Sequence, residues 1–141
     1  MIRELELLII KQLGEIMRLI IAGGRLHQLT EEDIFQLNKL QNISFVICGG
    51  ASGIDADGEA WAKSKNIPVA HFHADWAKHG KKAGPLRNRE MAKNADAVAL
   101  FTGGKGTDSM YKEAQKAGLK IYDFRDNAQL TLNFDGDKHG H

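Results

Sequence analysis

Strand-like and helix-like segments alternate along most of this chain. Runs rich in aliphatic and aromatic residues have the length of buried strands: residues 18–22, 45–48, 69–72, 97–101 and 120–124. Stretches with helical start and stop signals lie between them: residues 31–40, 55–65, 86–93 and 109–117. Such alternation requires right-handed crossovers, so it predicts an α/β fold, a doubly wound parallel sheet of about five strands with helices on both faces.

Glycine-rich turns follow three of the predicted strands. Their residues are Gly23, Gly24 and Arg25 after the first strand, Gly49, Gly50, Ala51 and Gly53 after the second, and Gly103, Gly104, Lys105, Gly106 and Thr107 after the fourth. A single such loop is typical of a tight turn, and none matches the Walker or GxGxxG spacing. Three of them at the carboxyl edge of a parallel sheet converge on one crevice. Glycines and a helix N-terminus there favour a phosphate group.

Several side chains near these turns have two interpretations each. Arg25 and Arg87 are suited to hold phosphate oxygens, or they form surface ion pairs. Asp55 either accepts a hydrogen bond from a ribose hydroxyl or caps the helix that begins beside it. Residues 74–84 form the one long connection, which could act as a lid and contains Asp75 and Trp76.

Composition excludes several classes of protein. The formal net charge is +1, so the whole chain lacks the basic excess typical of non-specific nucleic-acid binding. Its single cysteine, Cys48, excludes an internal disulfide, and no apolar run is long enough to cross a membrane, so we expect a cytoplasmic protein. His71, His73 and Asp75 alternate but lack a fourth partner, so no metal site is predicted.

The two ends of the chain are expected to lie outside the core domain. Residues 1–16 show helical apolar spacing and predict an amphipathic helix added before a domain at residues 17–125, with residues 126–141 forming a tail. The apolar stripe of the helix either packs on its own domain or mediates a homodimer. Deletion of residues 1–16 should give a monomer if the helix is the dimer contact, and an unchanged mass in light scattering would contradict it.

Five motifs taken together resemble the SLOG superfamily, and within it the bacterial and phage branch related to YpsA. They are residues 21–25 (IAGGR), 48–55 (CGGASGID), 74–76 (ADW), 84–88 (GPLRN) with Met91, and 103–107 (GGKGT) with Met110. The resemblance covers roughly residues 17–124. It implies a Rossmann-like fold that binds nucleotides or NAD- and ADP-ribose-derived ligands, with Trp76, Asn88 and the glycine turns among the ligand contacts.

The resemblance also sets the catalytic question. In the related phosphoribohydrolases a catalytic glutamate follows the GGxGT sequence by three residues, where this chain has Met110. Similarity to these enzymes would assign Arg87 a catalytic role. An N-glycosidase would need another carboxylate, and the choices are Asp55, Asp75, Asp108 and Glu113.

Three functions therefore remain open at this point. The first is nucleotide binding or sensing without catalysis and without a cofactor. The second is hydrolysis of an N-glycosidic bond, with Asp75 in a lid. The third is single-stranded nucleic-acid binding through a local basic patch with Trp76 for stacking, formed by Lys81, Lys82, Arg87, Arg89 and Lys93. The near-neutral charge of the chain counts against the third function.

Overall fold

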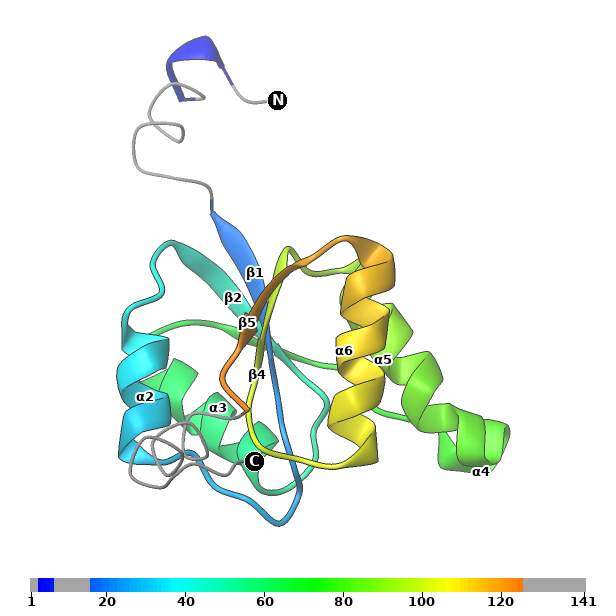
Figure 1. The fold of residues 1–141 in the computed structure, drawn as a ribbon. Helices are drawn as coiled ribbons and strands as arrows, with labels where there is room; N and C mark the ends of the chain where they lie inside the picture. Colours follow the sequence, from blue (N-terminus) through cyan, green and yellow to red (C-terminus); the bar gives the residue numbers. More distant parts are fainter. Residues whose placement is uncertain (1–2, 7–15, 126–141) are drawn as a thin grey trace, which may run out of the picture.

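A computed structural model describes residues 3–6 and 16–125, and its centre is a five-stranded sheet in the order β3-β2-β1-β4-β5 (Figure 1). All strand pairs are parallel. The strands are β1 (Met17–Ala22), β2 (Ile43–Cys48), β3 (Val69–His71), β4 (Ala97–Leu100) and β5 (Lys120–Asp123). The helical segments are α2 (Glu31–Asn38), α3 (Ile54–Ser64), α4 (Trp76–His79), the 3-10 turn η1 (Gly80–Lys82), α5 (Ala83–Lys93) and α6 (Lys105–Ala117).

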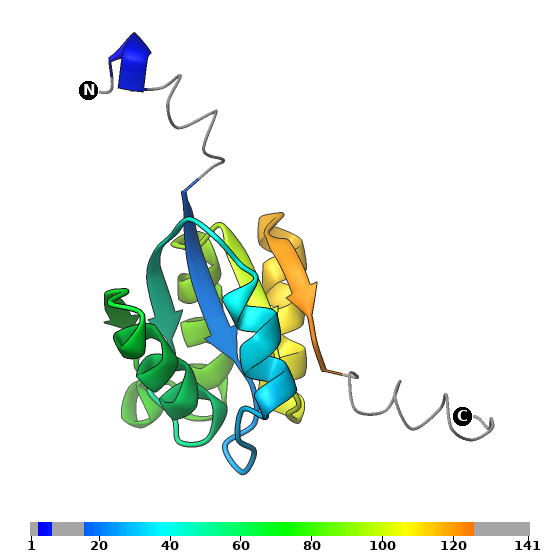
Figure 2. The same cartoon turned by 90° about the vertical axis from the view of Figure 1, so that its left-hand side faces the viewer.

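Helices cover both faces of this sheet. Helices α2 and α3 pack on one face, and α5 and α6 pack on the other (Figures 1 and 2). Strand β1 lies between β2 and β4, so the chain builds the sheet outward first in one direction and then in the other. The crevice expected in such folds lies at this switch point, beyond the carboxyl ends of β1 and β4. The predicted doubly wound α/β fold is confirmed.

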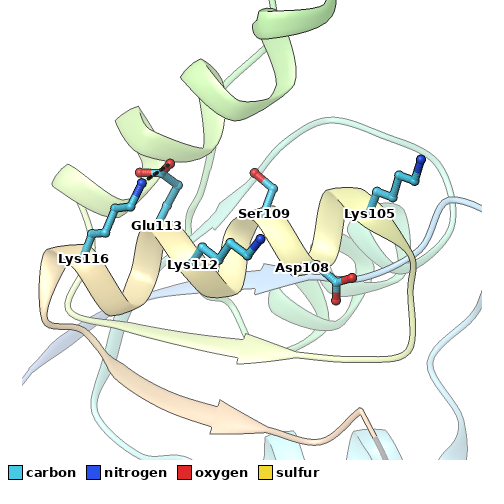
Figure 3. A pocket seen from close by; sticks show the side chains of 6 residues that line it. All are labelled: Lys105, Asp108, Ser109, Lys112, Glu113 and Lys116. Atoms are coloured by element: carbon cyan, nitrogen blue, oxygen red, sulfur yellow. Dashed lines mark ion pairs between the residues drawn. The ribbon is translucent and has the colours of Figure 1, made fainter.

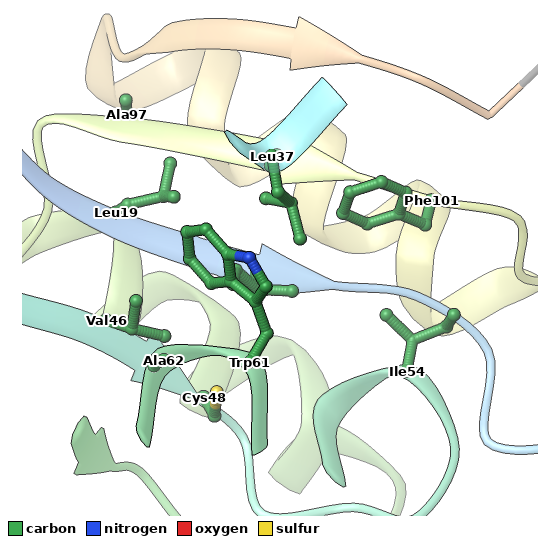
Figure 4. Close-up of a cluster of buried hydrophobic side chains, with 11 residues drawn as sticks. Leu19, Leu37, Val46, Cys48, Ile54, Trp61, Ala62, Ala97 and Phe101 are labelled. Carbon is green, nitrogen blue, oxygen red and sulfur yellow. The ribbon is translucent and has the colours of Figure 1, made fainter. Parts of the chain in front are cut away.

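Alternation along the central strand divides the core into two layers. Leu19 and Ile21 of β1 point toward α2 and α3, while Ile20 points toward α5 and α6, and all three are fully buried. Trp61 of α3 fills the first layer (Figure 4), and its indole Nε1 donates to Asn38 Oδ1 at 2.9 Å. A strand buried on both faces must be apolar throughout, which explains the continuous apolar runs in the sequence.

Local signals set the helix ends. Thr30 and Asp33 form a capping box at the start of α2, with each side chain bound to the other's backbone N–H at 3.0 Å. Helix α6 starts at Lys105, four positions before the predicted start, because its first turn consists of the glycine-rich sequence that reads as a loop. Residues 74–84 were expected to be one long connection, and this was wrong for most of them because α4, η1 and the start of α5 occupy residues 76–84.

Both predicted terminal segments fall largely outside the described residues. Of the predicted helix at residues 1–16, the structure describes residues 3–6 and 16, and Glu4, Leu5 and Glu6 are helical. The tail at residues 126–141 lies beyond the described range, so the dimer contact and the domain limits stay predictions. None of the helices in the described ranges is long and apolar enough to cross a lipid bilayer.

Candidate functional site

A cavity of about 970 Å³ opens at the carboxyl edge of the sheet. The loops after β1, β2 and β3, the N-terminal part of α5 and the first turns of α6 all contribute to its wall. Its volume is at the upper end of the range of small-molecule sites. Because these loops and helix ends surround it, the cavity lies at the topological switch point, where the three glycine turns were expected to meet.

Most of the predicted site residues line this cavity. They are Gly23, Gly24, Arg25, Gly49, Gly50, Ala51, Asp55, Trp76, Arg87, Asn88, Gly104, Lys105, Gly106 and Thr107. Gly103 and Asp75 do not line it. A Cβ on Gly103 would collide with the Thr107 side chain and lie 2.7 Å from the backbone nitrogen of Gly24, so this glycine lets two turns pack together. The role of the lining residues in ligand binding remains a prediction.

The first turn of α6 presents open backbone to the cavity. Its N-cap residue is Gly104, which has no side chain to cap the helix. A Cβ placed on Gly104 or Gly106 would meet no atom within 4 Å, so packing does not explain either glycine. Asn88 is 5% exposed and fixes the turn from α5, since its Nδ2 donates to Gly106 O at 3.3 Å and to Ser109 Oγ at 3.2 Å. Helix dipole and backbone N–H groups at such a position favour an anion.

Arg87 is held between the second glycine turn and α5. Its Nη1 donates to Gly49 O at 2.8 Å and its Nε donates to Asn88 Oδ1 at 3.0 Å. Burial lowers the pKa of its guanidinium and the nearby Asp55 charge raises it, but an arginine stays charged in either case. These contacts fix the guanidinium at the cavity wall while leaving donors of the five-donor fork for an anion.

Asp55 is the buried carboxyl of the cavity, with 8% of its surface exposed. It is the second residue of α3, and its Oδ2 accepts from the backbone N–H of Ala51 at 3.3 Å. Burial raises the pKa of this carboxyl, although the Ala51 and Gly49 backbone and the Arg87 charge act in the opposite direction. The capping interpretation of Asp55 was wrong, because the N-cap of α3 is Gly53 and no side chain caps this helix, whereas the ribose contact stays a prediction for a carboxyl that lines the cavity.

We expect Asp55→Asn to raise the thermal unfolding midpoint at pH 7. Asparagine keeps a carbonyl oxygen for the Ala51 N–H but carries no charge that burial penalises. Because the folded-state pKa is raised, the native state binds the extra proton, so wild-type stability falls as pH rises from about 4 through the folded-state pKa. Urea unfolding of both proteins across this range measures the effect. A wild-type protein more stable than the variant at pH 7 would show that attraction to Arg87 outweighs burial.

The other three carboxylates proposed for catalysis lie elsewhere. Asp75 caps α4 by accepting from the backbone N–H of Lys78 at 3.1 Å. Asp108 forms an ion pair with Arg125 at 3.1 Å, and Figure 3 shows its side chain on the side of α6 opposite Ser109. Glu113 forms ion pairs with Arg89 at 3.4 Å and Lys116 at 3.8 Å, beside a smaller cavity of about 320 Å³ on the outside of α6 (Figure 3). Met110, in contrast, lines the main cavity.

The structure gives the residues of the predicted basic patch different surroundings. Lys81 and Arg87 line the cavity, but Arg89 is engaged by Glu113. The sequence interpretation gave no ligand role to two histidines that line the cavity, His27 and His73. Each packs against a glycine turn, at Gly24 and Gly50 respectively. His27 lies three positions after Gly24, whereas His73 lies 23 positions after Gly50 and no sequence signal connects the two.

The alternating histidines have other partners. His71 Nε2 lies 2.7 Å from Glu59 Oε1, and the His71 ring stacks on His73 with centroids 5.9 Å apart. Hydrogen bonds and ion pairs from Lys63 and His71 lower the pKa of Glu59 to about 2. Within residues 3–6 and 16–125, no group of three or more histidine, cysteine or acidic side chains is placed to hold a metal ion.

Comparison with known proteins connects this site to a family. The model of the YspA, cpYpsA-related SLOG family matches residues 17–79, which include the first two glycine turns, Asp55 and Trp76. The Gene 61 protein of Mycobacterium phage D29 is 42% identical over 89 residues, an alignment that covers 57% of this chain and 71% of the phage protein. The turn at the start of α6 lies outside the residues matched by the family model.

Proposed function

Because the chain belongs to the YspA, cpYpsA-related SLOG family, we propose that it binds a nucleotide or a nucleotide derivative of the NAD and ADP-ribose type. The supporting observation is the convergence of three glycine turns and one helix N-terminus on a single cavity. The ligand's phosphate lies at the first turn of α6, where Gly104 and Gly106 leave space for it.

Three further groups complete the proposed phosphate and ribose contacts. Arg87 offers its unused guanidinium donors to phosphate oxygens, and the exposed Arg25 adds a second cation. Asp55 accepts a hydrogen bond from a ribose hydroxyl. None of these roles requires bond cleavage, so binding or sensing is the function that these residues support best.

Mass spectrometry tests the proposal directly. Purified protein is incubated separately with nucleoside monophosphates, ADP-ribose, NAD and cyclic ADP-ribose isomers, and the bound and free fractions are analysed. We expect one class of nucleotide to be recovered intact from the bound fraction. Failure of every compound to bind would overturn the proposal, and release of a free base would make the protein an enzyme.

Hydrolysis of an N-glycosidic bond is the second candidate function, and one observation favours it. Of the four carboxylates considered, Asp55 lines the cavity, and burial raises its pKa toward the range useful in acid–base catalysis. Water would add to the sugar carbon as the base leaves with its bonding electrons and a proton. Release of base that disappears in Asp55→Asn while binding persists would establish this function.

Gly106→Ala is expected to separate stability from binding. The new methyl group would meet no protein atom within 4 Å, and alanine in place of glycine in a helix adds about 0.5–1 kcal/mol of stability. The same methyl group would occupy the space assigned to phosphate and weaken nucleotide binding about tenfold or more. Urea unfolding and calorimetric titration with ADP-ribose measure the two effects. Unchanged affinity would place the phosphate elsewhere in the cavity.

A further inference from the structure

We propose that Trp76 forms a base-binding wall of the cavity, so that the ligand is a nucleotide carrying its base and not a sugar phosphate. This inference rests on the proposed function and deepens it. It assigns a direction to the ligand, with phosphate at the first turn of α6 and the base against α4.

The exposure of Trp76 is the first observation. The side chain lines the cavity and is 61% exposed, whereas the other tryptophan, Trp61, is 7% exposed in the core. A large aromatic side chain left in solvent does not stabilise the fold, and at the mouth of a cavity it is a marker of a binding surface. Its flat face can stack on any nucleobase.

The surroundings of Trp76 hold the ring in a defined position. Trp76 is the first residue of α4, and Asp75 caps that helix by accepting from the Lys78 backbone N–H at 3.1 Å. Gly84 of α5 lies next to the ring, since a Cβ placed there would be in ordinary van der Waals contact with Trp76 Cη2 at 3.4 Å. Asp75 is therefore a positioning residue for Trp76, which explains why a carboxylate outside the cavity precedes a tryptophan inside it.

The chemistry of the cavity differs between its two ends. The α6 end presents glycines, a helix N-terminus and Asn88, which are suited to an anion. The α4 end presents an aromatic ring with Lys81 in the same cavity wall. A ligand with phosphate at one end and a flat aromatic base at the other satisfies both, and a base-free sugar phosphate leaves Trp76 without a function.

The experiment compares two base-bearing probes, AMP and ADP-ribose, with base-free ribose 5-phosphate, by calorimetry and tryptophan fluorescence. We expect wild-type protein to bind the base-bearing probes more tightly and to change its fluorescence with them. In Trp76→Phe the fluorescence change should vanish, because the remaining Trp61 is buried, while most of the affinity stays. Trp76→Ala should weaken AMP and ADP-ribose about 5- to 150-fold and leave ribose 5-phosphate unchanged.

Three further variants complete the experiment. Phe35→Ala removes another half-exposed aromatic ring, from α2 and outside the cavity, and should change no affinity. Asp75→Ala should weaken the binding of the base-bearing probes, and Asp75→Asn, which preserves a helix cap, should bind them as the wild-type protein does.

Each alternative outcome has a separate meaning. Equal affinity of wild-type protein for AMP, ADP-ribose and ribose 5-phosphate would overturn the base-binding wall and leave the proposed phosphate site intact. An equal loss of affinity for all three probes in Trp76→Ala would also overturn it, because the ring would then only maintain the structure of the cavity. Absence of binding by every probe and by the nucleotide panel would overturn the proposed function itself, and this inference with it.

Discussion

Arg87→Ala is expected to lose affinity for ADP-ribose by about 10- to 150-fold or more while the protein stays folded. The guanidinium is fixed at the cavity wall by Gly49 O and Asn88 Oδ1, so it offers its remaining donors to an anion without further ordering. Hydrogen bonds between charged partners contribute about 1.5–3 kcal/mol each, which gives that range. The affinity of Arg87→Lys for ADP-ribose should lie between those of the wild-type protein and Arg87→Ala, since lysine keeps the charge and loses the planar fork. Calorimetric titration measures all three.

Arg89→Ala is the matched control for this result. Arg89 lies on the same helix, is 52% exposed and pairs with Glu113 at 3.4 Å outside the cavity, so its loss should leave ligand affinity unchanged. A second control addresses folding, because removal of Arg87 leaves the buried Asp55 charge without its nearby cation. The double variant Arg87→Ala, Asp55→Asn removes both charges and should fold, and it should bind more weakly than Asp55→Asn alone. Wild-type affinity in Arg87→Ala or in the double variant would contradict the role of Arg87 in binding phosphate.

The layout of the fold could be predicted from the sequence because its strongest signals are local. The runs buried on both faces, residues 19–22 of β1 and 97–100 of β4, contain no polar residue to obscure them. Glycine turns at strand ends also indicate a shared crevice, because parallel strands place those ends together. The start of α6 was misplaced for a related reason, since the glycines that suit an anion site are poor helix formers and conceal the first turn.

The limits of the sequence lie in contacts between distant segments. Asp75, Asp108 and Glu113 look equivalent to Asp55 in the sequence. Asp75 caps its own helix through a local contact, and tertiary structure pairs the other two with arginines. His73 enters the cavity because Gly50 makes room for its ring across 23 positions of sequence. Neither hydrophobic periodicity nor motif spacing in the sequence predicts these contacts.

Gly53→Ala is expected to destabilise the protein by about 2–6 kcal/mol. Gly53 has φ +72° and ψ −127°, a conformation that costs a side chain about 1–3 kcal/mol. A Cβ there would also collide with the carbonyl oxygen of Arg25 and lie 2.5 Å from that of Gly24, and overpacking of this kind costs about 1–3 kcal/mol. These are backbone atoms that cannot rotate away, so the first and second glycine turns must separate.

Gly118→Ala is the comparison variant for this loss, because it replaces a glycine of positive φ that has no close neighbour. Gly118 ends α6 at φ +73° and ψ 27°, and a Cβ there would meet nothing within 4 Å, so only the cost of the left-handed backbone remains, about 1 kcal/mol. Urea unfolding of both variants gives the difference between their losses, which contains the packing of the glycine turns and the additional backbone cost of ψ −127° at Gly53 over ψ 27° at Gly118. The Gly53 variant should also lose nucleotide binding at temperatures where it is still folded, because Gly24 and Arg25 line the cavity. Equal losses of stability in the two variants would mean that the two glycine turns move apart at little cost in free energy. The bound ligand, and not the free protein, would then fix the shape of the cavity.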